Sequence, residues 1–187
     1  MRRFTLALAG LLACCCCGIA SGAGQATAAG TAAKQSKQRA AALAWLGAEI
    51  AGYQKATWRW ERTMGRPLVQ TEGRLLAEMS IADVQRALRL WQQRAAAARR
   101  LAEKPPHLTQ FLCIHHYEGS WRDGGGPYYG GLQMNLGFQR TYAPWLYRTK
   151  GTADHWTPLE QIWTAERAAR SRGFWPWPNT ARFCGLI

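Results

Sequence analysis

Apolar side chains recur every three or four residues along two stretches of the chain. The first stripe consists of Leu43, Leu46, Ile50, Tyr53, Thr57, Trp60 and Met64, and the second consists of Ile81, Val84, Leu88, Trp91, Ala95, Ala98 and Ala102. This spacing places each set on one face of an α-helix. Gly65 and Pro67 predict the end of the first helix. Ser80 with Asp83 predicts a capping box at the start of the second.

Two such helices joined by a connection of about 15 residues predict an antiparallel helical hairpin over residues 41–104. Its apolar face is interpreted as core, and the alternative is a coiled coil that binds a partner. Residues 34–104 contain 14 Lys or Arg and six Asp or Glu, which is +8 of the net charge of +13. Outside a cell this charge favours polyanions such as anionic wall polymers over nucleic acid, unless the basic face is only solvated.

The first residues of the chain predict export. Arg2 and Arg3 precede an apolar run that is short for a bilayer span, and small residues follow it. A signal peptide over residues 1–28 is therefore predicted, with cleavage after Ala23 or Ala28, and a secreted or wall-associated protein is expected. Anchoring as a lipoprotein through Cys14 is the alternative. Residues 29–40 have no large apolar side chain and are predicted to be a flexible linker.

The cysteine count changes with this processing. Four of the six Cys lie in the predicted signal peptide, which leaves Cys113 and Cys184 in the mature chain. An even count in an exported protein favours a disulfide over two buried free thiols. Such a bridge would close a loop of about 70 residues and stabilise the fold by about 4 kcal/mol.

Residues 106–187 form a compact C-terminal region with six of the ten Trp. Its coarse pattern is helical, which makes the expected fold class mainly α. Thr157 as N-cap, Pro158 in the first position and Glu160 in the third predict a helix that stops at Gly173. A domain of about 80 residues buries little surface, so the Cys113–Cys184 bridge matters to its stability.

Glu118 is the clearest candidate for a catalytic residue. A helix with Leu108, Phe111, Leu112 and His115 on one face is predicted to end at Glu118 and Gly119. Its place in the last turn, at the negative end of the helix dipole and beside aromatic residues, makes Glu118 a candidate proton donor. Cleavage of a glycosidic bond needs such an acid, because the leaving oxygen must gain a proton.

The loop after Glu118 suits a sugar substrate. Its aromatic rings can cover sugar rings, its glycines let the backbone approach a glycan, and its amide supplies a donor and an acceptor. The alternative is a tight turn packed on a small core. The candidate substrate-binding residues are Trp121, Asp123, Tyr128, Tyr129, Gly130, Gly131 and Gln133.

Glycosidases usually employ two carboxylates. The others in the C-terminal region are Asp123, Asp154, Glu160 and Glu166. Glu160 is interpreted as a helix cap and Glu166 as part of a structural ion pair with neighbouring Arg residues, whereas Asp123 could contact substrate or orient a water. His115 and His116 lack the i, i+4 spacing of a helical zinc site, so neither a metal nor a cofactor is expected.

Several short blocks occur in a specific order, C…E-G-S-W…Y-Y-G-G-L-Q…A-E-R…G-F-W-P-W-P…C-G-L. Over residues 112–186 this order resembles the transglycosylase-like domain of the resuscitation-promoting factors and related secreted actinobacterial lysozyme-like proteins that cleave peptidoglycan. The resemblance implies Glu118 as the acid, residues 129–133 as the glycine-rich substrate strand, and a bridge between Cys113 and Cys184. It also implies a small lysozyme-like fold with a groove for alternating N-acetylglucosamine and N-acetylmuramic acid.

The chain departs from that pattern in two places. In the resuscitation-promoting factors the first Cys directly precedes the acid, whereas here residues 114–117 separate them. The segment between the acid and Gly-Gly-Leu-Gln is also shorter. Cys113 still lies about one helical turn from Glu118, so a bridge there can anchor the helix that carries the acid.

The leading hypothesis is a secreted peptidoglycan-cleaving enzyme that acts on the MurNAc-GlcNAc β-1,4 bond. Without a firm second acid, Glu118 would act as both general acid and general base, in lytic transglycosylation or in hydrolysis by water. A different class is a non-catalytic module that binds wall glycan. A third is a structural or signalling protein in which the helical hairpin binds the partner.

Overall fold

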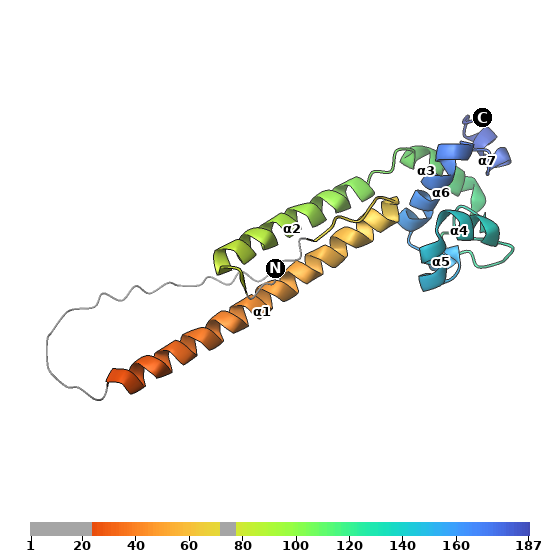
Figure 1. Cartoon of the computed structure of the whole chain (residues 1–187). Coiled ribbons are helices and arrows are strands. Elements are labelled where there is room, and N and C mark those ends of the chain that lie inside the picture. The colour runs from red at the N-terminus through yellow and green to blue at the C-terminus, as the bar shows by residue number, and fades with distance from the viewer. Residues whose placement is uncertain (1–23, 72–77) are drawn as a thin grey trace. The chain divides into compact units, whose positions relative to one another are not determined.

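The computed structural model describes residues 24–71 and 78–187, so most of the predicted signal peptide, Cys14 included, lies outside the described residues (Figure 1). The described residues are mostly helical, which confirms the predicted mainly α class. The elements are α1 (Gly24–Met64), α2 (Ile81–Ala102), α3 (Leu108–Glu118), β1 (Tyr128–Tyr129), β2 (Met134–Asn135), α4 (Leu136–Tyr142), α5 (Pro144–Lys150), the 3₁₀ helix η2 (Ala153–His155), α6 (Pro158–Arg172) and α7 (Pro178–Phe183).

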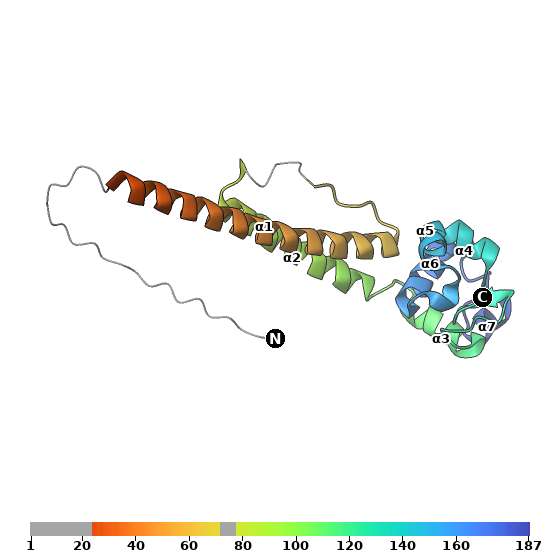
Figure 2. The same cartoon turned by 90° about the horizontal axis from the view of Figure 1, so that it is seen from below.

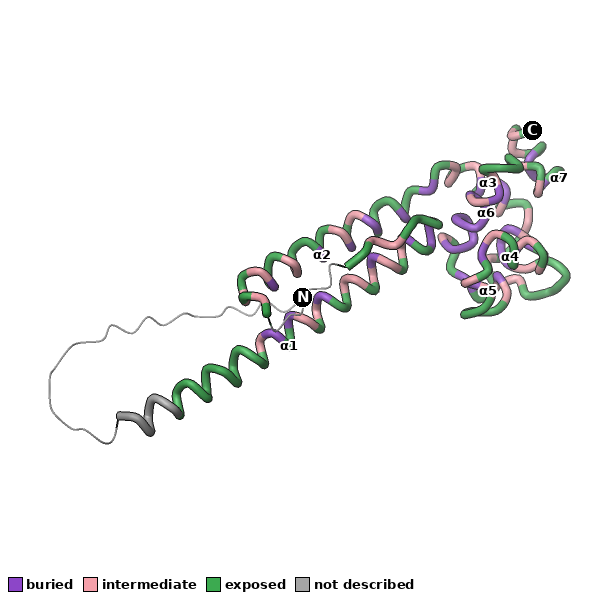
Figure 3. The backbone as a smooth tube through the Cα atoms, viewed as in Figure 1, coloured by how far each residue is buried: buried purple, intermediate pink, exposed green. Residues whose placement is uncertain are grey.

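Helix α1 differs from the prediction in its first half. Residues 29–40 are helical, where a flexible linker was predicted, and residues 30–41 are exposed (Figure 3). Ala, Gln and Lys have high intrinsic helix propensity, so a stretch without large apolar side chains can be helical without joining a core. None of the described helices is both long and apolar enough to cross a membrane.

The chain divides into two compact units, Met1–Ala41 and Ala42–Ile187. The packing of α1 on α2 and the contacts of the C-terminal region lie within the second unit. In that unit α1 and α2 run side by side in the same direction (Figures 1 and 2). The start of α2 packs on the middle of α1 through the buried side chains of Leu43, Leu46, Ile50, Val84 and Trp91. The two helices also end together, because Ala102 clusters with Met64 and with Trp163 of α6. The predicted antiparallel direction is therefore wrong.

The connection between α1 and α2 explains the parallel arrangement. The Trp58 indole donates to the Val69 carbonyl at 2.9 Å, and the Val69 N–H donates to Glu61 Oε2 at 3.0 Å, so the connection runs back along α1. An extended chain covers about 3.3 Å per residue, whereas a helix rises about 1.5 Å per residue. A chain that is not helical therefore needs fewer residues than the 22 of α2 to cover the same length, and residues 65–71 begin this return along α1.

The ends of α1 and α2 are fastened to α6 by side chains that bind helix-terminal carbonyls. Trp163 Nε1 donates to the Ala102 carbonyl at 2.8 Å, and Arg167 Nη1 donates to the Thr63 carbonyl at 2.7 Å. These carbonyls belong to the last turns of their helices, which lack intrahelical donors. Burial of the Arg167 guanidinium lowers its pKa to about 10. The three helices thus share one polar junction.

A second core holds the C-terminal region together. Helix α3 contributes Phe111 and Ile114 to it, whereas Leu112, which was predicted on the buried face, is 45% exposed. The face of α3 is therefore rotated from the predicted one. The principal buried side chains of this core are Phe111, Ile114, Leu132, Met134, Leu146, Trp156, Ile162 and Trp177.

Helix α6 crosses this core and begins as predicted. Thr157 and Glu160 form a reciprocal capping box, and Gly173 is the C-cap. Glu166 has a different partner from the predicted Arg residues, because it accepts a hydrogen bond from the His107 N–H at 2.6 Å and lies 3.0 Å from His107 Nδ1. It satisfies a backbone donor at the start of α3, one of the groups that a helix N-terminus leaves unpaired.

Candidate active site

Glu118 is the last residue of α3. The next residue, Gly119, is the C-cap with φ 135°, a left-handed conformation that glycine adopts without strain. Glu118 is half-buried, and its Oε1 accepts a hydrogen bond of 2.7 Å from the Thr180 hydroxyl of α7. The acid is therefore held in one orientation by a side chain that is 62 residues away in sequence.

Helices α3 and α7 are joined by three successive side-chain pairs. Cys113 and Cys184 form the disulfide, which confirms the predicted bridge, with a Cα–Cα distance of 6.1 Å. The rings of Tyr117 and Phe183 follow at 5.5 Å, and the Glu118–Thr180 hydrogen bond comes last. Numbers rise along α3 while they fall along α7, so the two helices run antiparallel. The bridge thus anchors the helix end that carries the acid.

Asp123 organises the loop that follows Glu118. Its Oδ1 accepts from the Gly125 N–H at 3.0 Å, its Oδ2 accepts from Gln133 Nε2 at 2.9 Å, and its carbonyl accepts from the Gly130 N–H at 2.7 Å. Both carboxylate oxygens are therefore engaged by the loop itself. Asp123 brings two predicted site residues, Gln133 and Gly130, together.

Gln133 connects the same loop to a two-stranded sheet. Strand β1 pairs antiparallel with β2, with Tyr129 opposite Met134. Gln133 lies in the turn between them with φ 47°, and its Nε2 donates to Asp123 Oδ2 and to the Gly130 carbonyl. Its amide oxygen accepts no hydrogen bond from the described residues, so an acceptor is available to a ligand here.

Gly130 and Gly131 pack against side chains of α3 and α6 and do not face open space. The Gly131 N–H donates to Gln161 Oε1 at 2.8 Å, and the Gly131 carbonyl accepts from His115 Nδ1 at 3.0 Å. A Cβ on Gly130 would lie 2.4 Å from Gln161 Oε1. The glycines are therefore required by contact with α3 and α6. The sequence had instead predicted that these glycines let a substrate approach the backbone.

We expect Gly131→Ala to lower the free energy of unfolding by about 2 kcal/mol, a typical cost of overpacking. Its Cβ would lie 2.5 Å from His115 Nδ1 and 2.7 Å from Trp121 Cε3, atoms that the core holds in place. Gly52→Ala is the matched control, because its Cβ meets nothing within 4 Å on α1, and it should gain up to about 1 kcal/mol. Urea unfolding of both variants measures the difference, and equal midpoints would contradict the close approach.

The three predicted aromatic residues differ in availability. Trp121 is half-buried, stacks on the His115 ring at 3.8 Å and packs against the core. Tyr129 is also half-buried and packs against the core, whereas Tyr128 is 48% exposed. Of the three, Tyr128 offers the most surface to a ligand.

Gln161 and Thr180 contact the predicted site residues, although the sequence patterns did not predict a role for them. Gln161 is buried in α6, where its amide nitrogen donates to the carbonyls of Trp121 and Ala153 at 2.9 and 2.8 Å while its oxygen holds Gly131. The signals in the sequence are a glutamine next to Ile162 and Trp163 in a predicted helix, and a threonine one turn before Cys184.

Three of the four other carboxylates in this region have structural partners. Glu160 binds Lys150 Nζ at 2.7 Å and caps α6, Glu166 binds His107, and Asp123 binds the loop. Asp154 Oδ2 lies 3.5 Å from His155 Nδ1. Within residues 24–71 and 78–187, no group of three His, Cys, Asp or Glu side chains could hold a metal ion.

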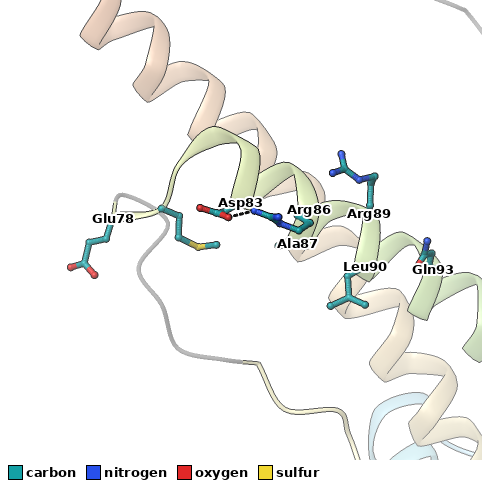
Figure 4. Close-up of a pocket in the computed structure, with 8 residues that line it drawn as sticks. Glu78, Asp83, Arg86, Ala87, Arg89, Leu90 and Gln93 are labelled. Carbon is teal, nitrogen blue, oxygen red and sulfur yellow. Dashed lines mark hydrogen bonds and ion pairs between the residues drawn. The ribbon is translucent and has the colours of Figure 1, made fainter.

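A separate hollow of about 790 Å³ lies along the first half of α2 (Figure 4). Its charged side chains include Glu78, Arg89 and the Asp83–Arg86 ion pair. Hydrogen bonds from the Ser80 hydroxyl and from Arg86 lower the pKa of the Asp83 carboxyl. All the lining residues belong to α2 or to the residues just before it, so this hollow is distinct from the surroundings of Glu118.

Comparison with known proteins adds no assignment to this geometry. No family model, curated protein or solved structure matches the chain.

Proposed function

We propose that the chain is a secreted enzyme that cleaves the MurNAc-GlcNAc β-1,4 bond of peptidoglycan, with Glu118 as general acid and base. The observation that carries the proposal is the half-buried Glu118, whose carboxylate is held by Thr180 at the end of a disulfide-anchored helix that a glycine-rich loop follows. We further propose that residues 106–187 are a small lysozyme-like domain of the resuscitation-promoting factor type. The order of the short sequence blocks between residues 112 and 186 supports this proposal.

The proposed reaction needs one acid in two protonation states. The protonated Glu118 gives its proton to the glycosidic oxygen as the bond to the muramoyl C1 breaks. The carboxylate then accepts the proton of the muramoyl C6 hydroxyl as its oxygen attacks C1, which yields a 1,6-anhydro sugar. If water attacks instead, the product is a reducing sugar. Because Thr180 engages Oε1, the other oxygen of Glu118 is the one left for this proton transfer.

The engagement of Asp123, the acid nearest to Glu118 in the sequence, supports a mechanism with one carboxylate. The two oxygens of Asp123 already accept hydrogen bonds from Gly125 and Gln133, so Asp123 is a positioning residue for the loop in this proposal. The substrate itself must then supply the group that a second carboxylate provides in most glycosidases. Transfer to the sugar's own C6 hydroxyl meets that condition.

Digestion of purified peptidoglycan by the chain tests the proposal. Mass spectrometry of the soluble products should detect anhydro-muropeptides, two hydrogens and one oxygen lighter than the hydrolytic products. Reducing muropeptides alone would assign hydrolysis. Glycan binding without any released product would support the alternative class, a non-catalytic wall-binding module, and would overturn the enzyme.

Thr180→Val is expected to lower kcat about tenfold with little change in KM. The substitution keeps the shape of a buried side chain but removes the hydroxyl that orients Glu118, and misplacing a proton donor affects the chemical step. Thr57→Val is the matched control, since Thr57 is also buried and its hydroxyl donates to the Tyr53 carbonyl of the same helix. An equal loss in both variants would indicate a general effect on stability, and no loss in Thr180→Val would remove the positioning role.

A further inference from the structure

Two aromatic side chains are exposed next to Glu118 without belonging to the predicted site. Tyr117 is 53% exposed and Phe183 is 71% exposed, with their ring centroids 5.5 Å apart and their planes tilted by 40°. The His116 ring continues the group at 5.0 Å from Tyr117. Phe111, Trp156 and Trp177 of the same region are buried. Apolar rings left together at the surface indicate a contact with a ligand or partner.

The pair is held in place before any ligand arrives. Phe183 precedes Cys184, and Tyr117 lies one turn after Cys113, so the disulfide fixes both backbones. Phe183 ends α7 and Tyr117 is in the last turn of α3. A surface that is already rigid loses little conformational entropy when it binds.

The position of the pair relative to the acid defines its role. Tyr117 is adjacent to Glu118, and Phe183 is one turn after the Thr180 that donates to Glu118. A glycan strand whose scissile bond lies at Glu118 must continue on both sides of that bond. A sugar ring next to that bond would then lie over the joined ends of α3 and α7, where both rings are exposed.

We propose that Tyr117 and Phe183 form a sugar-binding platform, on which one N-acetylated amino-sugar ring of the glycan strand lies. Sugar rings present apolar C–H faces, and Tyr combines an apolar ring with a hydroxyl that can bind a sugar hydroxyl. Two rings match one sugar in size and fall far short of the roughly 1,200 Å² that a stable protein interface buries. This inference rests on the proposed function, because it takes the scissile bond to lie at Glu118.

The test measures binding without turnover. In a Glu118→Gln background, the Kd for a hexamer of β-1,4-linked N-acetylglucosamine is measured by NMR titration or calorimetry. Tyr117→Ala and Phe183→Ala should each weaken binding about tenfold, which corresponds to about 1.4 kcal/mol. Tyr117→Phe should keep most of the affinity. Trp45→Ala is the control, because Trp45 is 62% exposed on α1 and lies 19 residues before the helix end.

The outcomes separate this inference from the proposed function. A tenfold loss in both alanine variants with none in Trp45→Ala supports the platform, whether or not the wild type cleaves peptidoglycan. Unchanged affinity in both variants, or no binding of the hexamer at all, overturns the platform even if cleavage is observed. Circular dichroism shows whether each variant is folded, and Phe183→Ala removes so exposed a ring that the fold should tolerate it.

Discussion

Glu118→Gln is expected to lower the rate of peptidoglycan cleavage by about a thousandfold, within the range that general acid–base catalysis contributes. Glutamine has nearly the same shape as glutamate, and its amide oxygen can still accept the Thr180 hydrogen bond. It cannot give a proton to the glycosidic oxygen. The loss should therefore fall on kcat, while affinity for the glycan stays close to that of the wild type.

The measurement compares product release from purified peptidoglycan by mass spectrometry, with both proteins at equal concentration. Glu103→Gln is the matched control, because Glu103 is an exposed carboxylate whose partner is Arg99 on α2, and it should cleave at the wild-type rate. Activity of Glu118→Gln within a few fold of the wild type would place the acid elsewhere. In that case Asp154 would be the next carboxylate to change.

Removal of the Cys113–Cys184 disulfide is expected to lower the free energy of unfolding more than any other substitution proposed for this chain. Cys113 and Cys184 are separated by 71 residues, and the chain-entropy model gives about 4 kcal/mol for a loop of this length. Small domains have only about 5–15 kcal/mol in total. We therefore expect the Cys113→Ala, Cys184→Ala double variant to unfold at a much lower urea concentration.

Reductant supplies the control for this experiment. Both proteins are prepared without residues 1–28, which contain the other four Cys. Reduced wild type should then unfold at the midpoint of the double variant, and the double variant itself should not respond to reductant. Because the bridge also holds the Tyr117–Phe183 and Glu118–Thr180 pairs in register, the hexamer affinity of the double variant should fall as well. An unchanged midpoint would mean that packing alone holds α3 against α7.

Local signals in the sequence were sufficient for several elements. The Thr157, Pro158 and Glu160 pattern predicted the start of α6 because a helix N-terminus needs acceptors for its free N–H groups. Gly119 predicted the end of α3 because the C-cap there has a positive φ. In both cases the deciding interaction joins residues that are neighbours in the chain.

The glycines show the limit of such reasoning. Their presence in the loop was predicted to serve a glycan, yet Gly130 and Gly131 are pressed against Gln161, His115 and Trp121. A glycine in a sequence indicates close approach, but it does not say what approaches. Only the packing of α3 and α6 against the loop identified the neighbours.

The sequence by itself determined the helical class, the apolar faces of α1 and α2, the caps of α6 and the position of Glu118 at a helix end. The tertiary structure decided that α1 and α2 run parallel, that Thr180 orients the acid, and that Tyr117 and Phe183 share one surface. The physical reason is the separation along the chain of the residues that interact. Periodicity and capping act within one or two turns, whereas direction and pairing depend on a 16-residue connection and on contacts 62 residues apart, which a local pattern does not encode.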